Sequence, residues 1–211
     1  MADIKELNRQ KRGQVSEAEV KLYEDASVDE LSILLNSDDS KKRTIAAIII
    51  GNQKILEMVP RLCRRLVIEK SLYSRIAVSE ALGKMGEPAV LPLIDLLGKV
   101  GNNQETGLSE KYCEKKSYPL ARDLAARTLV KIGKPAIPYL IAKIMSGDSF
   151  ETQQAIDAIG GIISKTHDMR PLPVLLEGLI KYSNNEVTTW KIIRALSALL
   201  PDADRWQVFH L

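Results

Sequence analysis

The feature that most constrains this chain is an internal repeat. The segments ALGKMGEPAV at residues 81–90 and TLVKIGKPAI at residues 128–137 share leucine, lysine, glycine, proline and alanine at positions 47 residues apart. Five segments with apolar residues at i and i+4 begin at residues 31, 62, 93, 140 and 175, with spacings of 31, 31, 47 and 35. The base period is therefore 31, and the spacing of 47 contains one period and an insertion of 16 residues. Such a period predicts one supersecondary unit stacked several times.

Each unit is predicted to be a pair of helices. Apolar and small residues follow helical spacing over residues 76–82, and Gly86 and Gly133 are expected in the left-handed conformation just past a helix end. Pro88 and Pro135 follow two residues later, where the first turn of a second helix accepts proline. No stretch alternates polar and apolar residues convincingly, so no β structure is expected. The helix pairs are expected at residues 41–70, 72–100, 119–146 and 150–182, with half-units at 27–36 and 186–211.

Stacking of these pairs defines the predicted fold class. A single pair cannot bury its apolar face, so neighbouring pairs are expected to share one core in a right-handed superhelical array. We therefore predict an all-α protein, with an α-solenoid over residues 27–211 and the second helices of the pairs on its concave face. The charged segment at residues 1–26 is either helical or mobile, and the insertion at about 99–118 is expected on one face, often the binding face.

The repeat also resembles a known family. The pattern RxAVSEALGxMGxPAVxPLIxLL, which starts at Arg75, is similar to the HEAT-like repeat named after the phycobilisome lyases. The resemblance covers about residues 40–200 and is close in two copies. It implies a HEAT/armadillo-like solenoid, a fold found in chromophore-lyase subunits and in kinase-associated scaffolds.

The sequence offers few candidates for catalytic or metal-binding residues. His167 and His210 lack a second ligand at the helical spacing that zinc binding uses, and no glycine-rich phosphate loop is present. Cys63 lies on an aliphatic helix face and is interpreted as an inert thiol, although Arg64 beside it could favour the thiolate. The Asp38–Asp39 pair adjoins a helix start and is explained by N-capping. We therefore expect no catalytic residues, no metal, no cofactor and no enzymatic activity.

The distribution of charge along the chain is more informative than the net charge. The chain carries 30 basic and 27 acidic residues, a net charge of +3 that indicates no particular partner. Residues 1–40 carry a net charge of −5, whereas residues 41–75 carry +7. Within the basic block, Arg61, Arg64 and Arg65 occupy positions i, i+3 and i+4 of one helix face. This face could bind an acidic protein surface or nucleic-acid phosphates, or could simply be solvated.

These observations predict a non-catalytic scaffold or adaptor that binds another protein, preferably an acidic surface, in its concave groove. The alternatives are a subunit or chaperone of a chromophore-lyase-type enzyme and a phosphate-backbone (nucleic-acid) binding protein. Apolar runs are shorter than the ~18 residues of a membrane-spanning helix, and two cysteines and no apolar leader favour the cytoplasm. The partner-binding residues predicted are Arg61, Arg64, Arg65, Asp95, Lys99, Tyr112, Lys143, Glu177 and Lys181.

Overall fold

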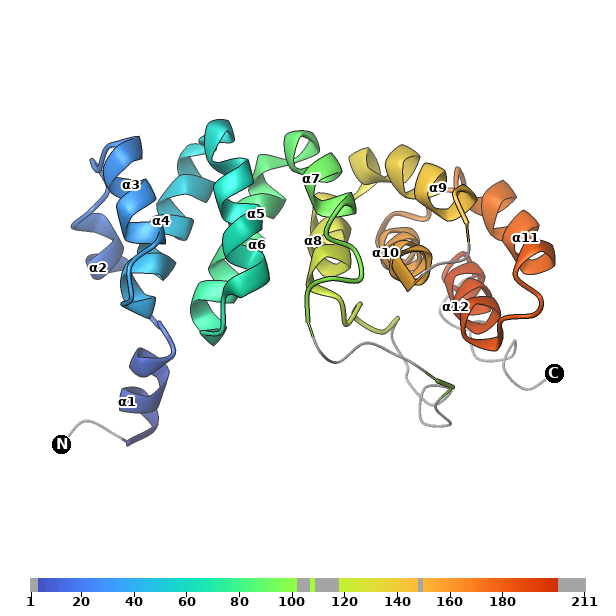
Figure 1. Cartoon of the computed structure of the whole chain (residues 1–211), viewed down its shortest axis with the longest axis horizontal. Helices are drawn as coiled ribbons and strands as arrows, with labels where there is room; N and C mark the ends of the chain where they lie inside the picture. Colours follow the sequence, from blue (N-terminus) through green and yellow to red (C-terminus); the bar gives the residue numbers. More distant parts are fainter. Residues whose placement is uncertain (1–3, 102–106, 109–117, 148–149, 201–211) are drawn as a thin grey trace. The chain divides into compact units, whose positions relative to one another are not determined.

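The computed structural model describes residues 4–101, 107–108, 118–147 and 150–200 (Figure 1). Within these ranges the regular secondary structure is helical and contains no strand, so the predicted all-α class is confirmed. No helix in the described ranges combines the length and the apolar character that crossing a membrane requires. The chain divides into two compact units, Met1–Pro92 and Leu93–Leu211, which are described in turn.

The first unit is built around two adjacent helices, α4 and α6, which lie side by side (Figure 1). They approach closely because Gly51 on α4 faces Ala81 on α6: a Cβ atom at Gly51 would lie only 2.7 Å from the Cα atom of Ala81. The helices of this unit are α1 (Ile4–Lys11), α2 (Glu17–Lys21), α3 (Val28–Leu35), α4 (Ser40–Gln53), a 3₁₀ turn (Leu56–Met58), α5 (Val59–Ile68) and α6 (Leu72–Met85).

Polar residues set the starts of these helices. The Asp39 side chain accepts a hydrogen bond of 2.8 Å from the backbone N–H of Lys41, so the capping role predicted for the Asp38–Asp39 pair is confirmed at Asp39. Ser27 and Glu30 form a reciprocal capping box at the start of α3. These local caps place α3 and α4 where the helical periodicity predicts them.

The charged N-terminal segment forms α1 and α2 and packs on the rest of the first unit. The backbone carbonyl of Arg12 accepts hydrogen bonds from Ser71 Oγ (2.6 Å) and from the N–H of Tyr73 (3.1 Å), which join it to the start of α6. Glu19 on α2 forms an ion pair of 2.7 Å with Lys41 on α4. In the described part of this segment the helices are two short ones rather than a single amphipathic helix.

The second unit is arranged around α10, which contacts α8, α9 and α12. The two consecutive glycines of α10 allow this packing: a Cβ atom at Gly160 would lie 3.2 Å from Ala195 Cα on α12, and one at Gly161 would lie 2.7 Å from a methyl carbon of Val130 on α8. The remaining elements are α7 (Val90–Ile94, across the division between the units), α8 (Leu124–Ile132), a 3₁₀ turn (Lys134–Ala136), α9 (Ile137–Met145), α10 (Phe150–Thr166), α11 (Leu172–Lys181) and α12 (Glu186–Ser197).

The two best-matched repeat copies have the same local structure. Gly86 (φ 70°, ψ −138°) and Gly133 (φ 80°, ψ −136°) both have positive φ, as expected. Their ψ values differ from the left-handed helical conformation that the sequence predicts, because each glycine extends the chain into a 3₁₀ turn that contains the proline. Leu82 and Leu129, one turn before these glycines, are fully buried.

The second helix of the predicted 72–100 pair is shorter than expected. α7 ends at Ile94, and the hydrogen bonds that follow connect residues three apart, as in Leu97 N–H to Ile94 O at 3.2 Å. The N–H of Gly98 then donates to the carboxylate of Asp123 at 3.0 Å. The N–H of Leu124 also donates to the carbonyl of Val100 at 3.2 Å. These bonds hold residues 98–100 beside residues 123–124.

Candidate functional site

Helix α5 presents the arginine residues that the sequence singles out. Val59, Leu62, Cys63 and Leu66 are buried on one side of this helix. Residues three and four positions apart share a helix face, so the opposite side carries the arginines. Because the aliphatic side is anchored in the core of the first unit, the orientation of the exposed side is fixed.

The exposed side of α5 is both basic and apolar. Arg61 and Arg64 are exposed, and Val67 and Ile68 beside them are 45% and 60% exposed. We call these four residues the α5 basic face. Arginine is one of the residues enriched at protein-binding surfaces.

Arg65 differs from the other two arginines. It is only half-buried on the side nearer α3, and its guanidinium donates a hydrogen bond of 3.1 Å to Asn36 Oδ1. Desolvation lowers the pKa of Arg65, although the nearby carboxylate of Glu69 opposes this shift. Arg65 is thus tied to the end of α3 by a tertiary contact that sequence spacing cannot reveal, and its surroundings differ from those of Arg61 and Arg64.

A buried ion pair lies between α4 and the segment that follows α5. Arg43 donates two hydrogen bonds to the carboxylate of Glu69, at 2.8 and 2.9 Å, and Ser74 and the N–H of Ser71 donate to it as well. Burial raises the pKa of Glu69, but these donors outweigh it and hold the pKa at about 2. A carboxylate satisfied in this way suits a structural ion pair rather than a proton-transfer group.

The other predicted partner-binding residues belong to the second unit, and several have contacts of their own. Lys99 donates to the backbone carbonyl of Asp95 at 2.8 Å, and Lys143 forms an ion pair of 3.1 Å with Glu151 on α10. Lys181 donates to the carbonyl of Met145 at 2.8 Å and lies over the ring of Tyr182. Glu177 is exposed on α11. Tyr112 lies outside the described residues.

Sequence reasoning missed a buried charge cluster in the second unit. Asp157 on α10 accepts a hydrogen bond of 2.5 Å from Lys191 on α12 and a second from Arg194. Lys191 is fully buried, and Arg194 also stacks on Trp190 at 4.2 Å from its ring centre. No sequence pattern indicates this cluster, because charged residues on two distant helices are usually exposed. The cluster joins α10 to α12.

Cys63 and the two histidines are the thiol and metal-ligand candidates in the sequence, and His210 lies outside the described residues. Cys63 is buried, as its aliphatic surroundings predict, and burial raises its pKa to about 11, which favours the protonated thiol at neutral pH. Within the described ranges, no group of three or more His, Cys, Asp or Glu side chains is placed to hold a metal ion. His167 lies in the turn after α10, as expected, with a φ of 50°.

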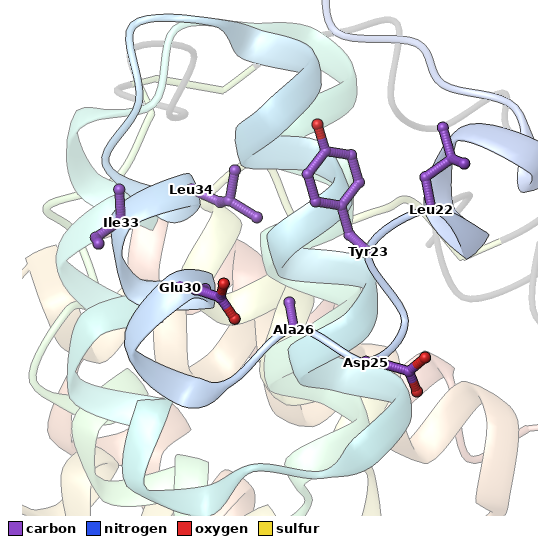
Figure 2. Close-up of a pocket in the computed structure, with 7 residues that line it drawn as sticks. All are labelled: Leu22, Tyr23, Asp25, Ala26, Glu30, Ile33 and Leu34. Atoms are coloured by element: carbon purple, nitrogen blue, oxygen red, sulfur yellow. The ribbon is translucent and has the colours of Figure 1, made fainter.

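A second surface feature, which the sequence analysis did not identify, is a hollow between α2 and α3 (Figure 2). Its volume is about 370 Å³. We call it the acidic hollow; its lining residues are Leu22, Tyr23, Asp25, Ala26, Glu30, Ile33 and Leu34. Ile33 could have indicated this hollow from the sequence. It is an apolar residue of α3 that does not lie on the helix face shared by Leu31 and Leu35, so it is expected to be exposed.

Comparisons with known proteins add no assignment. No protein-family model matches the chain, and a search of curated proteins finds no significantly similar sequence.

Proposed function

We propose that this protein is a non-catalytic adaptor, a HEAT-like α-solenoid that binds another protein through the α5 basic face. The observation that carries this proposal is the exposure of Arg61 and Arg64 beside Val67 and Ile68 on a helix whose other side is anchored in a core. The solenoid assignment is supported by the two repeat copies, which share the glycine conformation, the proline-containing turn and a buried leucine. The buried free thiol of Cys63 fits a reducing compartment, and we place the adaptor in the cytoplasm.

The composition of the face favours an acidic protein over nucleic acid. Guanidinium groups bind carboxylates and phosphates alike, but the exposed aliphatic side chains of Val67 and Ile68 add affinity only for a partner with apolar surface. The sequence of α5, VPRLCRRLVI, contains no aromatic residue on which an unpaired base could stack. A partner with carboxylates around an exposed apolar side chain matches this face best.

The experiment is affinity purification with the Arg61→Glu/Arg64→Glu variant, read by mass spectrometry. Arg65 is left unchanged because its hydrogen bond to Asn36 contributes to the fold. The variant should keep the helical circular dichroism of the wild type and lose the partner that the wild type recovers. A matched control, Lys42→Glu/Lys165→Glu, makes the same change in charge at two other exposed positions and should retain the partner.

Recovery of the same partner by the folded Arg61→Glu/Arg64→Glu variant would refute this site. Recovery of nucleic acid instead, with an affinity that falls steeply as salt rises, would favour the phosphate-binding alternative over a protein partner.

A further inference from the structure

The acidic hollow exposes large apolar side chains that a folded chain usually covers. Leu22 is 81% exposed and Ile33 is 72% exposed. Figure 2 shows these two residues at opposite sides of the hollow, with Tyr23 and Leu34 between them. A second hollow lies on the other side of Ile33 and is lined also by Asp29, Ser32, Asn36, Ser37 and Asp38. Ile33 is therefore an apolar ridge between two depressions.

The walls of the hollow are held in place before any ligand binds. Leu31 and Leu35 anchor α3 in the core, and the capping box of Ser27 and Glu30 fixes its first turn. On the α2 side, Gln53 on α4 donates a hydrogen bond of 3.0 Å to the carbonyl of Glu24, next to Asp25. A surface that is already ordered loses little conformational entropy on binding.

The surroundings of the hollow are strongly acidic. Two carboxyl groups, those of Asp25 and Glu30, line it, and Asp29 and Asp38 line the depression beyond Ile33. Between residues 17 and 39 the sequence contains eight acidic residues and one basic residue, Lys21. Glu19 is paired with Lys41, and Arg43 donates to the carbonyl of Asp38, so the carboxylates that line the hollow itself are those of Asp25 and Glu30. An occupant must therefore be apolar at its centre and positively charged around it.

We propose that the acidic hollow binds a basic amphipathic helical segment of a partner protein, which places apolar side chains on both sides of Ile33 and lysine or arginine residues over the surrounding carboxylates. A volume of about 370 Å³ accommodates a few side chains and not a folded domain, which favours a linear segment. Amphipathic helices bind apolar grooves through residues at i, i+3, i+4 and i+7. This site is lined by residues of α3 and of the connection between α2 and α3, and it shares no residue with the α5 basic face.

The test uses the full-length chain and a defined probe. A fluorescein-labelled helical peptide of leucine and lysine, about 14 residues long with leucines at helical spacing, is titrated and followed by fluorescence anisotropy. Ile33→Ser should weaken binding about tenfold, since it removes the central apolar contact. Asp25→Asn/Asp29→Asn should weaken binding severalfold and reduce its dependence on salt.

Three controls make the result specific to the hollow. Ile180→Ser/Glu186→Gln changes an equally exposed isoleucine and a carboxylate in the second unit, and should bind the peptide as the wild type does. A peptide with glutamate in place of lysine should not bind. Arg61→Glu/Arg64→Glu should not weaken binding of the lysine peptide, so a failure of the adaptor site and a failure of this site are distinguishable.

Two results would overturn the proposal. One is equal binding of the lysine peptide by the wild type and by folded Ile33→Ser. The other is a wild-type chain that self-associates in sedimentation equilibrium and becomes monomeric on Ile33→Ser, because a second copy of the chain would then occupy the hollow.

Discussion

At the scale of single residues, the Arg43–Glu69 pair is a buried ion pair with two hydrogen bonds in the first unit. The Glu69 side chain is 1% exposed and that of Arg43 is 12% exposed, so solvent screens the pair very little. Arg43 also donates to the carbonyls of Ser37 and Asp38 in the α3–α4 connection. The pair therefore joins that connection to the segment between α5 and α6, and a buried pair of this kind is costly to break.

Glu69→Gln should destabilise the folded chain and reduce its sensitivity to acid. The carboxyl group has a folded pKa of about 2 against an ordinary value of 4.5, so its stabilisation is complete above about pH 4.5 and is lost as pH falls toward 2. The substitution should cost about 3 kcal/mol at pH 7. Urea denaturation at pH 7, 4.5 and 3 measures both effects, and the variant should lose less stability than the wild type between the last two. Parallel loss in both proteins would contradict this role.

At the scale of elements, helix spacing is set by small residues at the points of contact. In the second unit Gly161 allows α10 to approach α8, since a Cβ atom there would lie 2.7 Å from a methyl carbon of Val130. Gly51 serves the same purpose for α4 and α6. Glycine inside a helix costs about 1 kcal/mol relative to alanine, so its presence at both contacts indicates that close packing outweighs helix propensity.

Gly161→Ala should therefore destabilise the chain, although alanine is the better helix former. Overpacking of this kind typically costs about 1–3 kcal/mol. Val130→Ala removes the opposing methyl groups, so in the double variant Gly161→Ala should cost less than it does alone. Chemical denaturation of the two single variants and the double variant gives the coupling free energy. A stabilising Gly161→Ala would mean that the two helices separate without penalty.

At the scale of the whole molecule, the solenoid hypothesis predicts that unfolding is cooperative only over neighbouring repeats. Repeats that contact only their neighbours transmit a local loss of stability over a short range. Leu82 is fully buried on α6, whose main packing partners are α4 and α5. A change at this residue therefore distinguishes a linear array from a single global core.

Leu82→Ala should cost about 2–5 kcal/mol and should act locally. Hydrogen exchange followed by mass spectrometry should show faster exchange in α4, α5 and α6, with little change in α11 and α12. Leu91→Ala, at a position that is 57% exposed, is the control and should leave exchange unchanged. A uniform increase along the whole chain would contradict a linear array of repeats.

Much of the helical architecture could be predicted because its signals are local. Helical periodicity placed the helix pairs, Asp39 was recognised as a cap, and the glycine–proline turns at Gly86 and Gly133 were expected with positive φ. Burial of Cys63 also followed from the aliphatic pattern around it. Each of these features depends on residues within a few positions of one another.

The candidate sites were only partly predicted, because they depend on contacts between distant segments. The exposure of Arg61 and Arg64 was expected, but the hydrogen bond from Arg65 to Asn36 spans 29 positions. The attachment of the N-terminal segment uses the backbone carbonyl of Arg12, which carries no side-chain signal. The acidic hollow is lined by residues 22–34, but the chain between α2 and α3 is held by the hydrogen bond from Gln53 to the carbonyl of Glu24, which spans 29 positions.

The closure of the insertion by Asp123 bears on how this chain can change over evolution. Its carboxylate receives the N–H groups of Gly98 and Ala126, while Val100 and Leu124 are joined through their backbones. The chain before residue 101 and the chain after residue 122 are thus joined at one place. Because these bonds link the two stretches directly, a change in the number of residues between them is expected to leave the start of α8 unaltered.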